Sequence, residues 1–393
     1  MAQRPRHSRF PSVPTLLLIA VLGGGGLVIG CGAGVESPPA NASASASTLP
    51  SASPRAPSAR PSASPSPSPS PVPLIYEDLS GIATTAELAH RYPIAVMIDD
   101  SPAARQQSGL SAASIVWQAP AEGGIPRYMA IFQSGTPPRV GPVRSARLYF
   151  VRWAAEWKAV YLHAGGPPPL RRFLAGRQTL VLDVNGRATS RVRFRASPHN
   201  LYTDGPRLRR FAERDLPTGK LAYDASEPGR LQPFRDVAPE AARGPDGGAI
   251  TVTYTSAKVA YRYDRASNTW LRSVDGREQH DALATDNRGN GAVGAGPRIA
   301  PTTVVVMVVP IRRSTSTSGP ALGALEADSI GKNTAWVFAD GRVTKGTWSK
   351  KSPTDRTRFF DGGGKEIAFP RGQIFFQVVP RASAARFSVE AAS

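Results

Sequence analysis

The sequence is poor in cysteine and histidine. Cys31 is the only cysteine among 393 residues, so the chain cannot form an internal disulfide, a cysteine-based zinc site or a CxxC redox pair. No two of the five histidines stand at the spacing of zinc ligands. A GxxxxGK[ST] phosphate-binding loop is missing, and Ser145 lacks the Gly-x-Ser-x-Gly setting of a hydrolase nucleophile. We therefore predict no metal and no cofactor.

Acidic residues are scarce relative to basic ones. The chain has 29 Asp and Glu against 48 Lys and Arg, a formal net charge of +19. Arg4, Arg6 and Arg9 supply three of these charges, so about +16 remains on the rest of the chain. Such a charge favours anionic partners such as lipid headgroups, wall polymers or nucleic acid. The basic residues form no run longer than two and accompany no zinc-finger or RNA-binding signature, so we predict no nucleic-acid partner.

Residues 1–30 have the three parts of an export signal. A basic start precedes the apolar run Leu16–Leu22, and Val28-Ile29-Gly30-Cys31 follows. The last four residues approximate a lipobox, in which the cysteine is diacylated before cleavage on its N-terminal side. An uncleaved membrane helix is the alternative, but four glycines at 23–26 interrupt it. We predict a lipoprotein signal peptide over 1–30 and a lipid anchor on Cys31, on the extracytoplasmic face of the cell membrane.

A segment of Pro, Ser and Ala follows over 31–73 and ends in alternating Ser and Pro at Ser64–Pro71. It cannot bury enough apolar surface to offset its chain entropy, so we predict a disordered linker biased to polyproline II. Its reach, on the order of 100 Å, would hold the folded body away from the membrane.

The hydrophobic period changes within the remaining chain. Over 74–225 short apolar runs alternate with helix-like segments, which predicts an α/β domain. Residues 226–248 are rich in Gly and Pro and are interpreted as an interdomain linker. Over 249–393 apolar residues alternate with period two, which predicts a mainly-β domain. We expect strands at 94–98, 115–118, 128–132, 160–162, 180–182, 250–254, 259–263, 303–309, 336–338 and 375–379, helices at 147–157 and 207–214 with Asp204 as N-cap of the second, and a hairpin turn at Asp340-Gly341.

Several blocks of sequence resemble one family. They are Tyr92–Leu110, Ala121–Arg127, Val140–Arg147, Leu162–Gly166, Pro198–Tyr202, Gly346–Trp348, Thr357–Asp361, Gly372–Gln373 and Gln377–Pro380. Together they are similar to the YerB-like lipoproteins, bacterial proteins with two adjoining domains of unknown function, both called DUF3048. The resemblance implies a membrane lipoprotein with this domain order and implies no reaction. Asp100 stands where Asn is common in the family and Gln118 where an acidic residue is common, which argues against an essential charge at either position.

The polar residues of these blocks fall at the ends of apolar runs. In open α/β sheets, ligands bind beyond the carboxyl ends of the strands. We therefore expect one cleft with Asp99, Glu122 and His163 as acid–base candidates and Arg144, Arg147, His199 and Asn200 as ligand-binding candidates. The structural alternative remains open: Asp99 would cap a helix at Pro102–Gln107, Arg144 would pair with Glu122, and His163 would bond a backbone carbonyl.

Two functions are consistent with these residues. The first is a non-enzymatic envelope protein that binds an anionic cell-wall ligand or an envelope partner protein. The alternative is a cell-wall hydrolase or transferase that uses Asp99, Glu122 and His163. Binding ranks first because no motif commits the chain to a reaction.

The anchoring prediction can be tested at one residue. Cys31→Ala removes the acyl acceptor, so the precursor should lose all labelling by a fatty-acid probe and migrate differently on gels. Labelling equal to that of the unmodified protein would show that Cys31 carries no lipid.

Overall fold

The computed structural model describes residues 75–167, 170, 180–183, 188–215, 231–282, 295–313 and 324–392, which all fall in one compact unit. The predicted signal peptide, Cys31 and the linker over 31–73 lie outside the described residues, as does the stretch 226–230 of the predicted interdomain linker.

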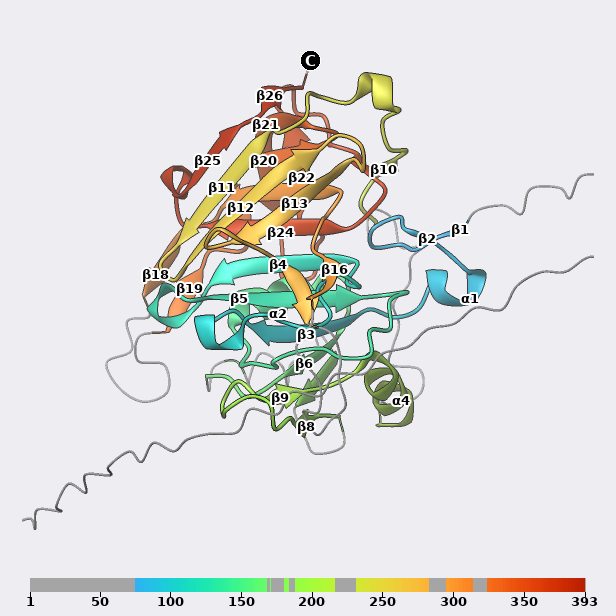
Figure 1. Ribbon diagram of the computed structural model, residues 1–393, viewed down its shortest axis with the longest axis vertical. Helices are drawn as coiled ribbons and strands as arrows, with labels where there is room; N and C mark the ends of the chain where they lie inside the picture. The colour runs from blue at the N-terminus through green and yellow to red at the C-terminus, as the bar shows by residue number, and fades with distance from the viewer. Residues whose placement is uncertain are drawn as a thin grey trace, which may run out of the picture. The chain divides into compact units, whose positions relative to one another are not determined.

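A mixed sheet of eleven strands runs through both halves of the described chain (Figure 1). In sheet order its strands are β22 (Arg358–Asp361), β21 (Arg342–Lys350), β20 (Gly331–Ala339), β17 (Thr303–Val308), β24 (Ile374–Val379), β4 (Ile115–Pro120), β5 (Pro126–Phe132), β3 (Ile94–Asp99), β6 (Val160–His163) and β7 (Leu180–Asp183), with β26 (Glu390–Ala391) beside β21. The junction lies between β24 and β4, which pair in parallel with Ile374 opposite Ile115. Main-chain hydrogen bonds therefore join the two halves directly.

Continuous apolar runs form the central strands because both faces of this sheet are covered. In β3, Val96 and Ile98 enter one core cluster while Ala95 and Met97 enter the other. Strands β4, β6, β17 and β24 are likewise buried at every residue. These strands confirm the predictions made from the apolar runs to within one or two residues.

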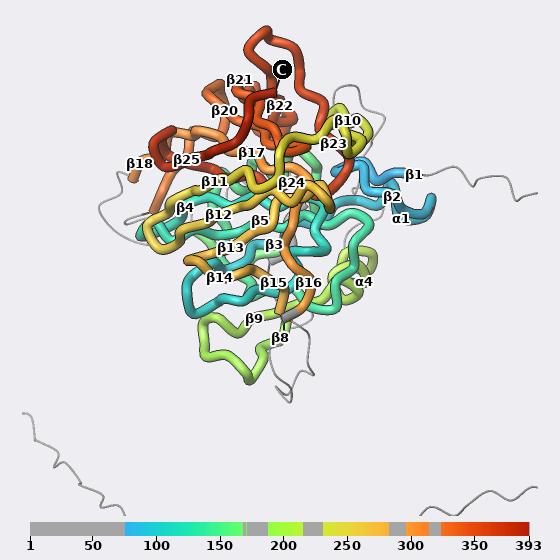
Figure 2. The backbone as a smooth tube through the Cα atoms, turned by 45° about the horizontal axis from the view of Figure 1, so that its top comes forward, coloured from blue at the N-terminus to red at the C-terminus, as the bar shows by residue number. Residues whose placement is uncertain are grey.

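A second sheet, entirely from the C-terminal half, covers the first core. Its antiparallel strands in order are β14 (Arg277–Glu278), β13 (Thr269–Val274), β12 (Ala257–Asp264), β11 (Ala249–Tyr254) and β25 (Ala385–Ser388). The predicted period of two is present, since Ile250, Val252 and Tyr254 are buried while Ala249 and Thr253 are exposed. Their buried side shares one core cluster with β3 and β4, and Figure 2 shows β11 to β13 lying over the central strands.

The second core lies under α2 (Leu148–Ala155) and contains a row of aromatic rings. Trp153 of the helix stacks on Trp117 of β4 with ring centroids 4.5 Å apart, and Trp117 stacks on Phe376 of β24 at 4.1 Å. Phe359 of β22 continues the row, 5.6 Å from Phe376. The row therefore crosses the β4–β24 junction and packs one half of the chain against the other.

Two local predictions are confirmed at turns. Asp204 caps α4 (Gly205–Asp215) because its Oδ1 accepts the N–H of Arg207 at 2.7 Å. The β20–β21 hairpin turns at Asp340-Gly341, whose φ angles of 50° and 72° lie in the left-handed region. A Cβ at Gly341 would lie 2.3 Å from the Tyr263 ring, so the turn also requires glycine for space.

Short elements complete the described structure. They are α1 (Ala86–Ala89), the pairs β1 (Ile75–Tyr76) with β2 (Ala83–Thr84), β8 (Ser190–Arg191) with β9 (Leu201–Tyr202), β10 (Phe234–Arg235) with β23 (Phe369–Pro370), β15 (His280–Ala282) with β16 (Ala295–Arg298) and β18 (Ile311–Arg313) with β19 (Leu325–Ala327), and the 3₁₀ turns η1 (Pro102–Ala104), η2 (Glu122–Gly124), η3 (Glu240–Ala242) and η5 (Ala382–Ala384). Within this described part, no helix has the length and apolarity needed to cross a membrane.

The predicted fold class is confirmed: a mixed α/β region precedes a mainly antiparallel β region. The division into two domains joined at 226–248 stays a prediction. In its described part, β10 pairs with β23, and Gln232 accepts a hydrogen bond from Arg356 at 2.7 Å. The central sheet and both core clusters contain residues from the two halves. The halves therefore share their cores in place of packing as two separate bodies.

The aromatic row makes a testable prediction about this junction. Phe376→Ala should lower the free energy of unfolding by about 3–5 kcal/mol, because it removes the ring that Trp117 and Phe359 both contact. Denaturant unfolding followed by tryptophan fluorescence should still show one transition. Phe387→Ala, at a side chain that is 37% exposed, is the control and should cost clearly less. Separate transitions for the two halves in Phe376→Ala would contradict a shared core.

Candidate functional site

The segment between β5 and α2 brings the predicted site residues to the end of β3. Asp99 donates its N–H to the carbonyl of Pro142 at 2.8 Å, and Arg144 donates its N–H to the carbonyl of Met97 at 3.0 Å. The loop after β6 joins from the other side, because Ala164 donates its N–H to the carbonyl of Arg144 at 2.9 Å. Three of the blocks that carry the family resemblance therefore meet through main-chain hydrogen bonds.

Asp99 is the centre of a first polar cluster. Its Oδ2 accepts hydrogen bonds from Arg144 Nε and His199 Nδ1, each at 2.7 Å, and its Oδ1 accepts the Ser101 N–H at 2.9 Å. Burial raises the pKa of Asp99, but the hydrogen bonds from Ser101 and His199 and the charge of Arg144 bring it below its ordinary value. The side chain of Asp99 is only 4% exposed, whereas Arg144 is 25% and His199 20% exposed. An ionised, buried carboxylate thus orients two accessible groups.

Glu122 is the centre of a second cluster. It accepts hydrogen bonds from two nitrogens of Arg147 and, at 3.0 Å, from Arg127. The third Arg147 nitrogen donates to the carbonyl of Ala146. Burial raises the pKa of Glu122, but the hydrogen bonds from Arg147 and the charge of Arg127 hold it below its usual range. Every nitrogen of Arg147 is therefore already engaged inside the protein.

The two clusters are neighbours on one face of the central sheet. Asp99 and Arg127 lie opposite each other in the β3–β5 ladder. Residues of a strand alternate between faces, so Asp99 shares the α2 side with Met97, and Arg127 shares it with Met129. The ladder places a negative and a positive side chain next to each other at the strand ends.

His163 and Asn200 have other contacts. The Nδ1 of His163 lies 2.8 Å from the carbonyl oxygen of Gly165, as the structural alternative anticipated, and Asn200 accepts a hydrogen bond from Arg191 at 2.6 Å. The histidine that contacts Asp99 is His199. The structure thus arranges the candidates as two ion-pair clusters with His163 and Asn200 bonded elsewhere, which differs from the expectation of a single set. Arg144 pairs with Asp99 in place of Glu122, and the expected helix at 102–107 is the single turn η1.

Asp100 points to the opposite face and belongs to a buried network that the sequence analysis missed. Its Oδ2 accepts a hydrogen bond from Gln118 Nε2 at 2.6 Å, and its Oδ1 accepts one from Arg105 Nε at 3.2 Å. The Oε1 of Gln118 in turn accepts a hydrogen bond from Arg272 of β13 at 2.7 Å. Burial raises the pKa of Asp100, and the charges of Arg105 and Arg272 oppose that rise. The guanidinium of Arg272 lies 5.3–5.7 Å from the rings of Tyr128, Tyr261 and Phe375.

This network contains Asp100 and Gln118, the two positions at which the sequence differs from the pattern expected for the family. Asp100 replaces the common Asn and Gln118 replaces the common acidic residue, and the two side chains are in direct hydrogen-bond contact. The pair thus has one carboxylate and one amide, at exchanged positions compared with that expectation. In this chain the pair supplies one negative charge on the same side of the central sheet as Arg272, and Gln118 links that carboxylate to Arg272.

A signal for Arg272 is present in the sequence. In β13, Trp270, Arg272 and Val274 alternate with more exposed residues and are all buried. An arginine at an inward position of an alternating strand requires an acceptor within the core, because an unpaired buried charge is costly. That requirement points to a buried carboxylate or amide on the facing sheet.

The geometry of the Asp99 cluster suits ligand binding better than acyl transfer. The Ser101 Oγ lies 3.2 Å from His199 Nδ1, the nitrogen that Asp99 also contacts. In a Ser-His-Asp triad the serine and the aspartate contact different ring nitrogens. Asp99 and Glu122 both have lowered pKa values, whereas a pair of acid–base carboxylates needs one raised value. Among the described residues, no three His, Cys, Asp or Glu side chains gather at a possible metal site.

Comparisons with known proteins identify the same two regions. The model for the "Protein of unknown function (DUF3048) N-terminal domain" matches residues 79–218, and the model for the corresponding C-terminal domain matches 250–376. "Putative lipoprotein YerB" of Bacillus subtilis (strain 168) is 36% identical to this chain over 206 residues. The matched region is 50% of this chain and 60% of that protein, so the chain spans less than two thirds of its relative's length. The crystal structure of YerB protein from Bacillus subtilis has a TM-score of 0.66 and 27% identity, covering 80% of this chain and 99% of that one. The resemblance found in the sequence blocks is confirmed.

The exchanged pair makes a prediction by mutation. Asp100→Asn should lower the free energy of unfolding by about 3–5 kcal/mol, because it removes the buried charge that pairs with Arg105 and that Gln118 links to the buried Arg272. Adding Gln118→Glu should restore most of that loss, because the carboxylate returns from the other position. Chemical unfolding of the two single variants and the double variant measures this coupling. Additive losses in the double variant would show that the two positions act independently.

Proposed function

We propose, from the premise that the chain belongs to the DUF3048 family, that it is a membrane-anchored lipoprotein which binds an anionic cell-wall ligand or an envelope partner protein on the extracytoplasmic side. The anchoring part is supported by the lipobox-like sequence Val28-Ile29-Gly30-Cys31 after an apolar run. It is also supported by a relative whose name describes it as a lipoprotein.

The binding part rests on one observation, the state of Arg144. Asp99 accepts from Nε of Arg144, and one terminal nitrogen lies 3.5 Å from His199. The rest of the guanidinium edge, on a side chain that is 25% exposed, is available to a ligand. His199 is bound through Nδ1 and leaves its Nε2 for the same purpose. A guanidinium fixed in place binds carboxylate or phosphate oxygens with little loss of freedom.

Arg147 has a different role in this proposal. Glu122 and the carbonyl of Ala146 occupy all of its nitrogens, and its side chain is 11% exposed. It stabilises the loop that carries Glu122 and the segment that carries Arg144. Of the two arginines expected to bind the ligand, the geometry therefore favours Arg144.

The contact between Asp99 and His199 supports a second candidate function, a hydrolase or transferase acting on wall material. A carboxylate on Nδ1 holds the imidazole with Nε2 outward, which is the arrangement of a general base. In this version His199 acts as the base in place of His163. Glu122 holds Arg127 and Arg147 in position.

Two arginine variants separate binding from stability. Arg144→Ala should weaken binding of teichoic-acid fragments or muropeptides about ten- to a hundredfold, because a charge-assisted contact is lost. It should also cost about 1–3 kcal/mol of stability, because the buried Asp99 keeps Ser101 and His199 but loses a charged partner. The variant that isolates binding from stability is therefore Arg147→Ala, which should keep its affinity. Arg147→Ala should cost about 1–3 kcal/mol through the partly buried Glu122.

The measurements are calorimetric binding and thermal unfolding of the unmodified protein and both variants. Absence of binding by the unmodified protein to any envelope anion would contradict the proposal. Binding by Arg144→Ala equal to that of the unmodified protein would also contradict it. Turnover of muropeptides that is lost in His199→Ala would favour the enzymatic candidate instead.

A further inference from the structure

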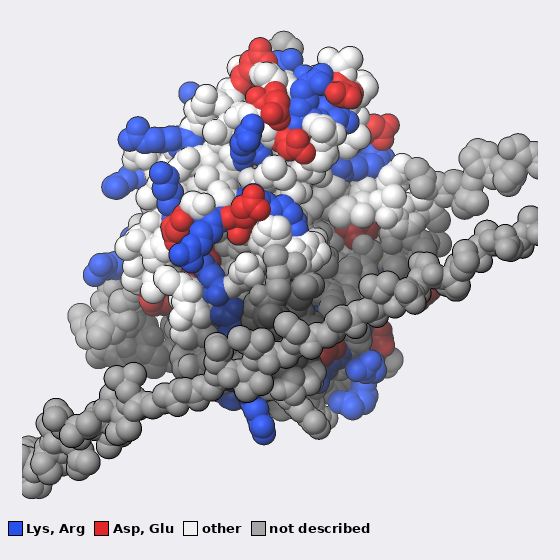
Figure 3. Space-filling view, viewed as in Figure 1, with Lys and Arg blue, Asp and Glu red and all other residues white. Residues whose placement is uncertain are grey.

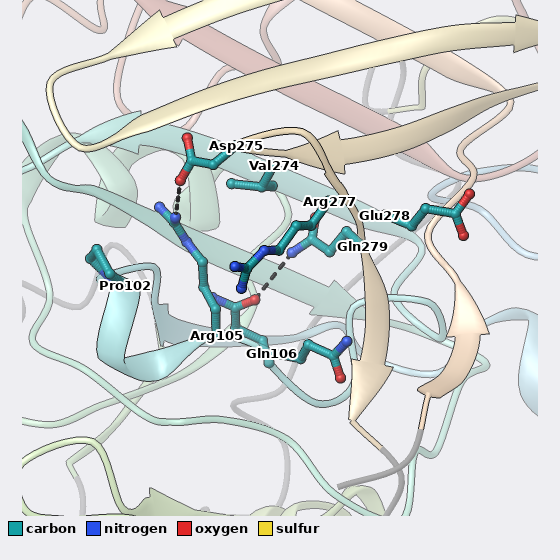
Figure 4. A pocket seen from close by; sticks show the side chains of 9 residues that line it. Pro102, Arg105, Gln106, Val274, Asp275, Arg277, Glu278 and Gln279 are labelled. Carbon is teal, nitrogen blue, oxygen red and sulfur yellow. Dashed lines mark hydrogen bonds and ion pairs between the residues drawn. The ribbon is translucent and has the colours of Figure 1, made fainter.

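A cavity of about 460 Å³ lies between the loop after β3 and the β13–β14 hairpin. Pro102, Arg105 and Gln106 line one side, and Val274, Arg277 and Gln279 line the other (Figure 4). The cavity is therefore formed by both halves of the chain. Its volume falls within the range of small-molecule sites, roughly 300–1,000 Å³.

The charges around this cavity leave one group unused. Arg105 is engaged by Asp100, by Asp275 at 2.5 Å and by the carbonyl of Ser256 at 3.1 Å. Glu278 points away in Figure 4 and pairs with Arg298.

Arg277, by contrast, has no hydrogen bond or ion pair within the described residues, and Figure 4 shows its guanidinium extending into the cavity beside Arg105. The net charge available to a ligand is therefore one positive guanidinium, which suits a carboxylate or phosphate.

The floor of the cavity contains an incomplete hydrogen-bond set. Gln279 is 4% exposed, and its Nε2 donates to Oε1 of Gln107 at 3.1 Å. Its Oε1 is buried and has no hydrogen-bond partner among the described residues. A buried acceptor without a donor is costly. This oxygen has almost no accessible surface, so a ligand in the cavity reaches it once the Gln279 side chain turns toward the cavity. Gln106 offers an amide at the rim with both a donor and an acceptor.

We propose that this cavity binds a short peptide with a free C-terminal carboxylate. Arg277 holds the carboxylate, the Gln279 side chain turns to accept a peptide N–H, and the terminal side chain packs on Val274 and Pro102. A ligand that contacts both Arg277 and Gln279 needs a negative charge next to an N–H donor. A peptide C-terminus has both groups, whereas a simple anion has only the charge. This site is separate from the Arg144 site and does not depend on it.

Occupancy should also stabilise the fold. The ligand contacts η1 and its following loop from the N-terminal half and the β13–β14 hairpin from the C-terminal half. A ligand that binds only the folded state raises the melting temperature with concentration. The thermal shift is therefore a direct readout of binding.

The test uses the full chain in detergent micelles and the probe acetyl-Ala-Ala, with its C-terminal amide and inorganic phosphate as comparison ligands. We expect the free acid to bind and to raise the melting temperature, and the amide to bind at least tenfold more weakly. Arg277→Gln should lose binding of the acid at least tenfold without a change in the melting temperature of the free protein, because Arg277 is exposed and unpaired within the described residues.

Two controls sharpen the result. Arg386→Gln removes an exposed arginine at the other edge of the same sheet, and Arg144→Ala alters the site proposed above, so both should bind the probe normally. The proposal is overturned if the free acid does not bind, if the amide or phosphate binds as tightly as the acid, or if Arg277→Gln binds normally. Loss of binding in Arg144→Ala alone would assign the peptide to the Arg144 site and would equally overturn it.

Discussion

A fully buried guanidinium is the constraint on which the arrangement of the two halves depends. Arg272 has no exposed surface and lies between the second sheet and the central sheet. It donates to Tyr261 in its own sheet and to Gln118 in the central sheet. Gln118 and its partner Asp100 come from the other half of the chain. Removing one partner of such a network costs far more than a surface contact contributes, so the network strongly penalises any other placement of the second sheet.

The same constraint positions the candidate site. Asp99 and Asp100 are consecutive, so their side chains leave the sheet on opposite faces. Asp100 is held in the network on one face, and this fixes the end of β3 from which Asp99 meets Arg144 and His199 on the other. Asp100 thus stabilises the fold, while its neighbour Asp99 orients the candidate ligand-binding groups. The cavity beside Arg277 adjoins the network as well, because Gln107, which lines the cavity, donates to Oδ1 of Asp100 at 3.2 Å.

The sequence predicted the strands well and the site less completely, for physical reasons. Continuous apolar runs such as Ile94–Ile98 require burial on both faces, and alternation in Ile250–Tyr254 requires one buried face, so both patterns are local. Pairing between β24 and β4 is not local and could not be read from either strand. Arg144 and Arg147 stand three apart, yet only Arg147 borders a helix, so the two side chains reach different carboxylates. The sequence alone did not show that Asp100 and Gln118 contact each other, so their relation as one carboxylate and one amide could not be predicted.

We expect the buried network and the β4–β24 pairing to make the two halves one cooperative unit. Native-state hydrogen exchange along β4, β24 and β13 tests it most directly, because it reports the free energy of opening for each strand separately. The slowest amides of all three strands should exchange with the same free energy and the same denaturant dependence. An N-terminal half that stays protected while β24 and β13 exchange at a clearly lower free energy would contradict it.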